Sequence, residues 1–186
     1  MTTKSPENKL NRRDAIKMLS GASISGLLLP STQVFAASER QLSFYHTHTQ
    51  RKLDITYARE GHYIDTALTD INIFLSDFRT HDITEIDTGL LDLIHDVRQL
   101  LGSNGRYEVI SAYRSPRTNE MLRTRSSDSG VAKNSQHLLG KAIDVRLDDV
   151  KLNELRDAAI TMQRGGVGYY KDSNFVHIDT GAVRRW

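Results

Sequence analysis

Strand-like and helix-like segments alternate irregularly between residues 41 and 179, and this order excludes most fold classes. Apolar residues that alternate predict strands, and apolar residues at helical spacing predict helices. The expected strands are a hairpin over 41–57 and the segments 107–113, 142–147, 167–170 and 175–179; the expected helices are 64–78, 88–101, 116–125 and 151–163. Because strands and helices do not follow a repeating βαβ order, we predict an α+β fold with a small antiparallel sheet and the helices packed on one side of it.

The first 36 residues predict a signal peptide, not a part of the fold. A polar stretch with five basic residues precedes an apolar run from Met18 to Leu29, and Val34-Phe35-Ala36 supplies the small residue at which a leader peptidase cleaves. The pair Arg12-Arg13 resembles a twin-arginine signal, which sends folded proteins across the membrane. We therefore expect export to the periplasm and a mature domain over residues 37–186.

The charge of the mature domain gives no support for nucleic-acid binding. The whole chain has a net charge of +2, but five basic and two acidic residues lie within residues 1–36. The remaining 20 basic and 21 acidic residues leave the mature domain near −1, without the basic surface that nucleic-acid-binding proteins carry. No apolar run reaches the roughly 18 residues that a transmembrane helix needs. We expect the mature chain to be a monomer.

The chain contains no cysteine, so a metal site has to use histidine and carboxylate ligands. His137 precedes a predicted strand, and Asp144 lies on that strand. His177 and Asp179 share one face of a second strand, because side chains alternate along a strand. Zinc takes imidazole and carboxylate ligands, and two histidines with one aspartate leave a fourth position for water, as in catalytic sites. Spacing alone does not separate such a site from a chance arrangement.

The composite pattern is more specific. Ser135 to Asp144 reads S-x-H-x-x-G-x-A-x-D, and a strand histidine follows 33 residues later; this resembles the zinc peptidase family M15. The stretch from Gly165 to Gly181 and the ending Arg184-Arg185-Trp186 resemble its murein endopeptidase branch. The resemblance implies a hedgehog/D,D-peptidase-type fold and one zinc ion. The implied metal ligands are His137, Asp144 and His177.

The resemblance also implies the reaction, which is hydrolysis of amide bonds in peptidoglycan stem peptides and their cross-links. Arg114 matches a family arginine that faces the active site, where its guanidinium would neutralise an oxyanion or clamp a substrate carboxylate. Many members place an acid three residues before the last zinc histidine, but this chain has Asn174 there. Asp179 is the first candidate for the general base and Asp172 the second; Asp179 alternatively orients His177.

Three functions remain open from the sequence. The first is a zinc-dependent murein endopeptidase that cleaves cross-links during cell-wall remodelling. The second is a D,D- or L,D-carboxypeptidase that trims stem peptides. The third is a non-catalytic peptidoglycan-binding module, for which the missing acid at Asn174 is the supporting feature. The presence of all three metal ligands together with Arg114 favours an enzyme.

Overall fold

The computed structural model describes residues 39–125 and 130–186, and the predicted signal peptide lies outside them. Within these ranges the fold is built on one eight-stranded sheet with the order β3-β2-β1-β4-β5-β7-β6-β8. The strands are β1 (Glu39–His46), β2 (Lys52–Arg59), β3 (His62–Tyr63), β4 (Tyr107–Ser111), β5 (Ala142–Leu147), β6 (Gly166–Tyr170), β7 (Phe175–Asp179) and β8 (Arg184–Arg185). Neighbouring strands are antiparallel, except that β1 runs parallel to β4 and β6 runs parallel to β8.

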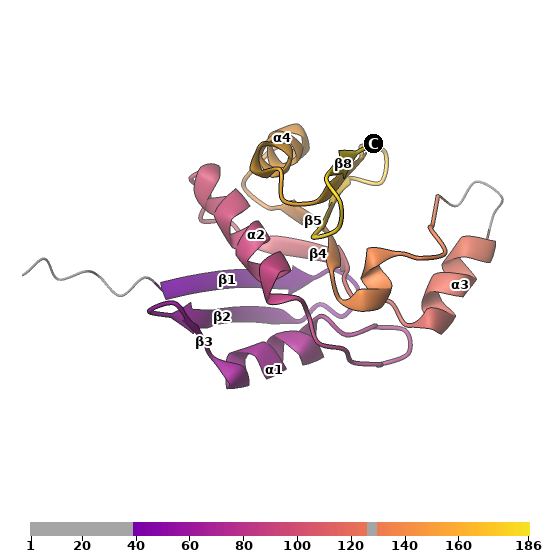
Figure 1. Ribbon diagram of the computed structural model, residues 1–186, viewed down its shortest axis with the longest axis horizontal. Coiled ribbons are helices and arrows are strands. Elements are labelled where there is room, and N and C mark those ends of the chain that lie inside the picture. The colour runs from indigo at the N-terminus through magenta and orange to yellow at the C-terminus, as the bar shows by residue number, and fades with distance from the viewer. Residues whose placement is uncertain (1–38, 126–129) are drawn as a thin grey trace, which may run out of the picture. The chain divides into compact units, whose positions relative to one another are not determined.

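Three helices pack on one face of the sheet: α1 (Asp65–Phe74), α2 (Thr88–Leu100) and α4 (Leu152–Met162). Their apolar side chains and the inward side chains of the strands form one hydrophobic core, and Figure 1 shows α2 crossing over the strands. α3 (Pro116–Thr124) stands apart from these helices in Figure 1. This arrangement confirms the α+β class. None of the helices in the described ranges combines the length and hydrophobicity that a membrane span requires.

The central strands have one apolar and one polar face. Val176 and Ile178 of β7 point into the core, as do Ile143 and Val145 of β5. The alternate residues therefore point to the outer face, which the core helices do not cover. Asp144 pairs with His177 across these two strands. The alternation of apolar and polar residues thus places a carboxylate and an imidazole side by side on the outer face.

A β-bulge in β4 brings a third residue to this face. Val109 pairs with Val145 in the core, but Ser111 pairs with Asp144, because the register shifts between Val109 and Ser111. An extra residue in one strand turns the following side chains to the opposite face. Ser111 therefore lies beside Asp144, and the chain leaves the sheet directly before Arg114.

The predicted elements differ from the structure where tertiary bonds override apolar spacing. The helix predicted over 64–78 ends at Phe74, although Leu75 and Phe78 continue its spacing. Asp77 stops it: one carboxylate oxygen accepts a hydrogen bond from the backbone N–H of Arg79, and the other accepts from Ser115. The strand predicted over 107–113 ends at Ser111. The sheet is larger than predicted, because the two-residue strands β3 and β8 are too short to show alternation. It is also not wholly antiparallel, since β1 pairs with β4 and β6 with β8 in parallel.

Candidate metal centre

Three buried side chains converge on the outer face of the sheet. His137 Nε2 lies 3.2 Å from Asp144 Oδ1 and 3.2 Å from His177 Nδ1, and His177 Nδ1 lies 2.9 Å from Asp144 Oδ1. Within the described parts of the chain, these residues form the one group of at least three histidine or acidic side chains with ligand spacing. The structure therefore brings together the three residues that the sequence predicted as metal ligands.

His137 is held by a short helix that the sequence did not predict. The 3-10 helix η1 (Gln136–Leu139) begins after Ser135, whose hydroxyl accepts a hydrogen bond from the backbone N–H of His137. The ring Nδ1 lies 2.6 Å from the carbonyl oxygen of Ala112. A carbonyl oxygen only accepts, so Nδ1 carries the proton and Nε2 presents a lone pair. The backbone thereby fixes the tautomer that a metal ligand needs.

Gly140 ends this helix in a left-handed conformation with φ of +66°, and a Cβ there would lie 2.2 Å from the backbone oxygen of Glu85. We expect Gly140→Ala to lower the free energy of unfolding by at least about 2 kcal/mol, since both strain and the clash oppose it. Gly102→Ala is the matched control, because Gly102 has φ of +61° and open space around its Cβ position. Urea denaturation of the mature chain measures both; equal losses would contradict the role of the clash.

His177 is oriented by Asp179, two residues further along β7. Nε2 of His177 donates to Asp179 Oδ2 at 2.8 Å, so Nδ1 faces Asp144 with its lone pair. The other contacts of Asp179 come from backbone N–H groups and an arginine: Gly166, Gly181 and Arg184 all donate to it. Asp179 is 0% exposed. Its carboxylate therefore has partners on both oxygens and lies on the side of the imidazole away from Nδ1.

Asp144 divides its two oxygens between the histidines and Arg114. Oδ1 faces His137 and His177, while Oδ2 accepts a hydrogen bond from Arg114 Nη2. Arg114 is held in turn by Ser111, whose hydroxyl accepts from Nε at 2.9 Å, and its backbone N–H donates to the carbonyl of His137. The β-bulge of β4 therefore supplies the support that keeps Arg114 beside the candidate metal ligands.

The electrostatics favour an ionised carboxylate next to a neutral imidazole. Burial raises the pKa of Asp144, but the opposing effects of the adjacent His137 and His177 imidazoles and of the Arg114 guanidinium are larger and hold the pKa well below its ordinary value. Burial also lowers the pKa of His137. Burial lowers the pKa of His177 too, but its hydrogen bonds to Asp144 and Asp179 outweigh this and raise it. A proton on His177 Nδ1 therefore competes with a metal ion.

The donor atoms fit a zinc ion. Two imidazole nitrogens with lone pairs and one carboxylate oxygen face a common point, and such acceptors repel each other unless a cation or a proton lies between them. Ligands about 2.0–2.1 Å from zinc in a tetrahedron are about 3.3 Å apart, close to the distances of 2.9–3.2 Å between these atoms. Three protein ligands leave one position for water or substrate, as in catalytic zinc sites.

The three residues lie in a cleft of about 260 Å³. Its lining includes the chain that leads to η1, with Val131 and Ser135. It also includes aromatic side chains from the end of β6, the start of β7 and the C-terminus: Tyr170, Phe175 and Trp186. Arg114 and Arg184 also line it. The candidate metal ligands therefore share one cleft with aromatic rings and two guanidinium groups.

The sequence comparison identifies the family. Residues 34–186 match the peptidase family M15_2, described as peptidoglycan L,D-endopeptidase MepK. The chain belongs to this family. The match confirms the resemblance to M15 peptidases that the S-x-H-x-x-G-x-A-x-D pattern indicated.

Similar proteins span nearly the whole length of this M15 peptidase. Peptidoglycan L,D-endopeptidase MepK of Escherichia coli K12 is 40% identical over 180 residues, which cover 95% of this chain and 97% of the relative. A Haemophilus influenzae protein named "Probable peptidoglycan L,D-endopeptidase MepK" is 36% identical over 172 residues, with 90% and 91% coverage. No solved structure matches this chain.

The structure places Asn174 and the base candidate Asp172, both in the β6–β7 turn, outside the cleft that holds His137, Asp144 and His177. Asn174 is exposed and lines a separate hollow with Glu108 and Arg146. Asp172 is exposed and does not line the metal cleft. Among the described residues, Asp144 is the one carboxylate that lines the cleft. The position of the usual family acid therefore faces a different part of the surface in this chain.

Sequence reasoning did not assign a role to Arg184, Phe175 or Trp186. Arg184 contacts Asp179, and the other two line the cleft. Tyr170 lines the cleft as well. The glycine-containing segment from Gly165 to Gly168 and the C-terminal residues were both part of the family pattern. The sequence of either segment does not show that the two lie side by side in the fold. A Cβ at Gly168 would lie 2.7 Å from the Trp186 ring, so this glycine makes room for the indole.

Proposed function

We propose that this M15 peptidase is a zinc-dependent murein endopeptidase that hydrolyses peptide cross-links of peptidoglycan in the periplasm. The observation that carries the proposal is the convergence of two imidazole nitrogens and one carboxylate oxygen within a cleft. The names of relatives at 36–40% identity support peptidoglycan as the substrate and favour an L,D bond.

The ligand residues would hold the ion through His137 Nε2, Asp144 Oδ1 and His177 Nδ1. When bound, zinc supplies a Lewis acid that polarises a carbonyl and lowers the pKa of a water molecule. The protein contributes fixed orientation: Ala112 and Asp179 hold the two imidazole tautomers, and Arg114 holds the carboxylate. Because these groups are buried and already hydrogen-bonded, they need little reorganisation when substrate arrives.

Arg114 is suited to act on the substrate as well. It lines the cleft, and its contacts to Ser111 and Asp144 use Nε and Nη2. A guanidinium has five N–H donors in a fixed fork, so with respect to the described residues the Nη1 donors are available for a substrate oxygen. We assign them to the scissile carbonyl oxygen, where negative charge develops. Loss of this role lowers kcat, whereas loss of a clamp on a substrate carboxylate raises KM.

We propose that Asp179 orients His177 and does not act as the general base. All of its hydrogen-bond partners are internal, it is 0% exposed, and it lies behind the imidazole as seen from the other two ligands. A general base has to reach the water or substrate proton within about 2.6–3.2 Å, directly or through one water. The orienting role, which the sequence left as an alternative, agrees better with this placement.

The experiment that tests the proposed function is digestion of purified cross-linked muropeptides by the mature chain, with products read by mass spectrometry. We expect dimers to disappear and monomers to accumulate with zinc, and neither to happen with a chelator or with His177→Ala. His62→Ala is the matched control, because His62 is an exposed histidine on β3 near the opposite edge of the sheet.

The alternatives give different products. Loss of a terminal residue from monomers, with dimers intact, would replace the endopeptidase with a carboxypeptidase. Stoichiometric zinc binding without any cleavage would support a binding module.

We also propose that residues 1–36 are a twin-arginine signal peptide. Replacing Arg12 and Arg13 with lysine keeps the charge but removes the paired guanidinium groups that the pathway recognises. We expect the double variant to accumulate in the cytoplasm at full length, while the wild type is found cleaved in the periplasm. Cell fractionation and immunoblotting measure this. Lys9→Arg serves as the control, and unchanged export of the double variant would contradict the assignment.

A further inference from the structure

We propose that the C-terminal residues Arg184 and Trp186 complete the active site. Arg184 is a positioning residue that holds His177 through Asp179. Trp186, together with Tyr170 and Phe175, forms a wall that binds the aliphatic side chain of a substrate residue next to the scissile bond. The second part rests on the proposed endopeptidase function, whereas the first concerns metal binding alone.

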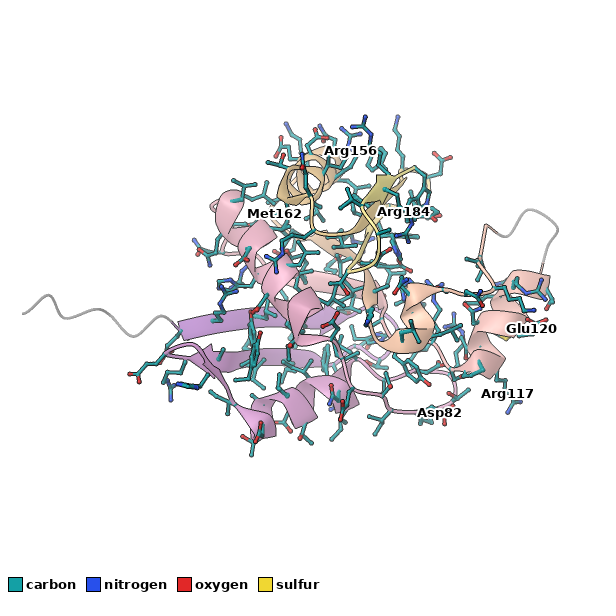
Figure 2. The ribbon with its side chains drawn as sticks, viewed as in Figure 1. Asp82, Arg117, Glu120, Arg156, Met162 and Arg184 are labelled. Carbon is teal, nitrogen blue, oxygen red and sulfur yellow. The ribbon has the colours of Figure 1, made fainter. Side chains whose placement is uncertain are left out.

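Arg184 forms a two-pronged contact with the buried carboxylate. Its Nη2 donates to Asp179 Oδ2 at 2.6 Å, and its Nη1 donates to Oδ1 at 3.2 Å. The same Oδ2 accepts the N–H of His177. Arg184 lies on β8, the yellow strand at the C-terminal edge of the sheet (Figure 2). The guanidinium thus balances the charge of Asp179 and fixes the carboxylate in the plane that His177 requires.

The geometry around Asp179 leaves little freedom for a replacement of Arg184. A Cβ at Gly166 would lie 2.6 Å from both Asp179 Oδ2 and Arg184 Nη1, and the backbone of Gly165 approaches the carbonyl of Asp179 closely. Without the arginine, Asp179 keeps its bonds to Gly166 and Gly181 but loses its charge partner. Partners of metal-ligating histidines typically contribute 10–100-fold to metal affinity. Arg184 contacts Asp179 and not His177 itself, so we expect an effect at the lower end of that range.

Both the backbone and the side chain of Trp186 form hydrogen bonds with β6. Its backbone N–H donates to the carbonyl of Val167, its carbonyl accepts from Tyr169, and its indole N–H donates to the hydroxyl of Tyr170 at 2.8 Å. Its ring centre lies 5.3 Å from that of His177. Nevertheless Trp186 remains 51% exposed. An anchored aromatic ring that keeps half of its surface open toward a cleft is prepared for a ligand.

The wall extends from Trp186 to the stacked rings of Tyr170 and Phe175, whose centres are 4.6 Å apart. Since this surface begins beside a metal ligand, it meets the residues that flank the cut bond, not the distant glycan. The long-chain residues at a peptidoglycan cross-link are diamino acids with several methylene groups. Burial of one methylene group contributes about 0.8 kcal/mol, so a flat apolar wall favours such a chain over an alanine side chain.

Metal affinity tests the role of Arg184 independently of catalysis. We expect Arg184→Gln to weaken zinc binding about tenfold in competition with a chromogenic chelator, and Arg184→Lys to restore part of it. Arg185→Gln is the matched control, because this neighbouring arginine is exposed and does not line the metal cleft. Circular dichroism checks folding. Equal zinc affinities for Arg184→Gln and Arg185→Gln would overturn the positioning role, whether or not the wild type cleaves muropeptides.

Trp186 offers a direct probe of the wall because it is the only tryptophan in the chain. We expect a saturable change in tryptophan emission when cross-linked dimers containing a diamino acid are added to the chelator-treated mature chain. We expect no comparable change with an alanine-containing peptide of equal length. Unchanged emission up to the solubility limit of the dimer would overturn the wall.

Kinetics then separate substrate binding from chemistry. We expect Trp186→Ala to raise KM for the diamino-acid cross-link about tenfold, with kcat and zinc affinity nearly unchanged, and Trp186→Phe to recover part of the loss. A fall in kcat or zinc affinity at constant KM would overturn the wall and indicate a purely structural role. If the wild type cleaves no cross-link at all, the proposed function fails, while the zinc and fluorescence titrations still decide this inference.

Discussion

Replacing Asp144 with alanine is expected to abolish stoichiometric zinc binding and to lower kcat/KM at least about a thousandfold, roughly 4 kcal/mol of transition-state stabilisation. Two effects combine. The variant lacks the one anionic donor that faces His137 and His177, and it leaves the Arg114 guanidinium beside two imidazoles without its carboxylate partner. Breaking a buried ion pair from one side costs about 3–5 kcal/mol, so the unfolding midpoint also falls.

Glu108→Ala is the matched control for this variant. Glu108 on β4 forms an ion pair with Arg146 on the neighbouring strand β5. Arg146 follows Asp144 by two residues, so both side chains lie on the same face of β5. Both side chains of that pair are partly exposed, and such pairs contribute about 0–1 kcal/mol. Zinc content by mass spectrometry, kcat/KM on muropeptides and urea denaturation are compared for both variants. Retention of stoichiometric zinc and activity by Asp144→Ala would remove Asp144 from the metal site.

Asp179→Asn is expected to weaken zinc binding about 10–100-fold while leaving the fold intact at moderate temperature. In the variant, one oxygen still accepts from Gly166 and Gly181, but an amide NH₂ group faces the N–H of His177 and the guanidinium of Arg184. Donors then oppose donors, and an unsatisfied buried group costs about 1–3 kcal/mol. The imidazole loses the contact that fixes its tautomer, so the metal ligand is lost in part of the molecules.

This variant decides between the two roles of Asp179. If it orients His177, excess zinc restores most of kcat, since the fully loaded variant retains the reacting groups. If it is the general base, zinc affinity stays near that of the wild type and kcat falls without recovery. Asp172→Asn is the control, because it removes a carboxylate from the exposed β6–β7 turn outside the cleft. A large loss of kcat in the control would make Asp172 the base instead.

The convergence of His137, Asp144 and His177 was predictable because the composite family pattern names all three and strand alternation places Asp144 and His177 on one face. Asp144 and His177 lie in segments whose apolar neighbours define a strand face, His137 directly precedes the first of these strands, and the lack of cysteine restricts the donor types. The helices α2 and α4 were predictable for a similar reason, since their apolar stripes match the buried faces. Local pattern and tertiary structure agree at these positions.

The supporting contacts were not predictable from local pattern. Arg184 and Trp186 reach the site because β8 pairs with β6 in parallel, a contact made by two residues with no periodic signal. The early end of α1 has the same origin, since the side chain of Asp77 binds Ser115, 38 residues further along the chain. Such long-range hydrogen bonds determine the site's outer contacts, while the apolar pattern determines the elements that carry them.

The two-faced strands β5 and β7 restrict how this chain tolerates changes in length. In β7, the core residues Val176 and Ile178 alternate with His177 and Asp179, which point to the outer face, with a period of two residues. A single inserted or deleted residue within either strand would turn the apolar side chains outward and the ligands into the core. Insertions of one residue are therefore expected only in connecting segments, such as the exposed turn over residues 171–174. The same strand register places the core side chains and the proposed metal ligands. A shift of one residue would therefore lower the stability of the fold and abolish metal binding together.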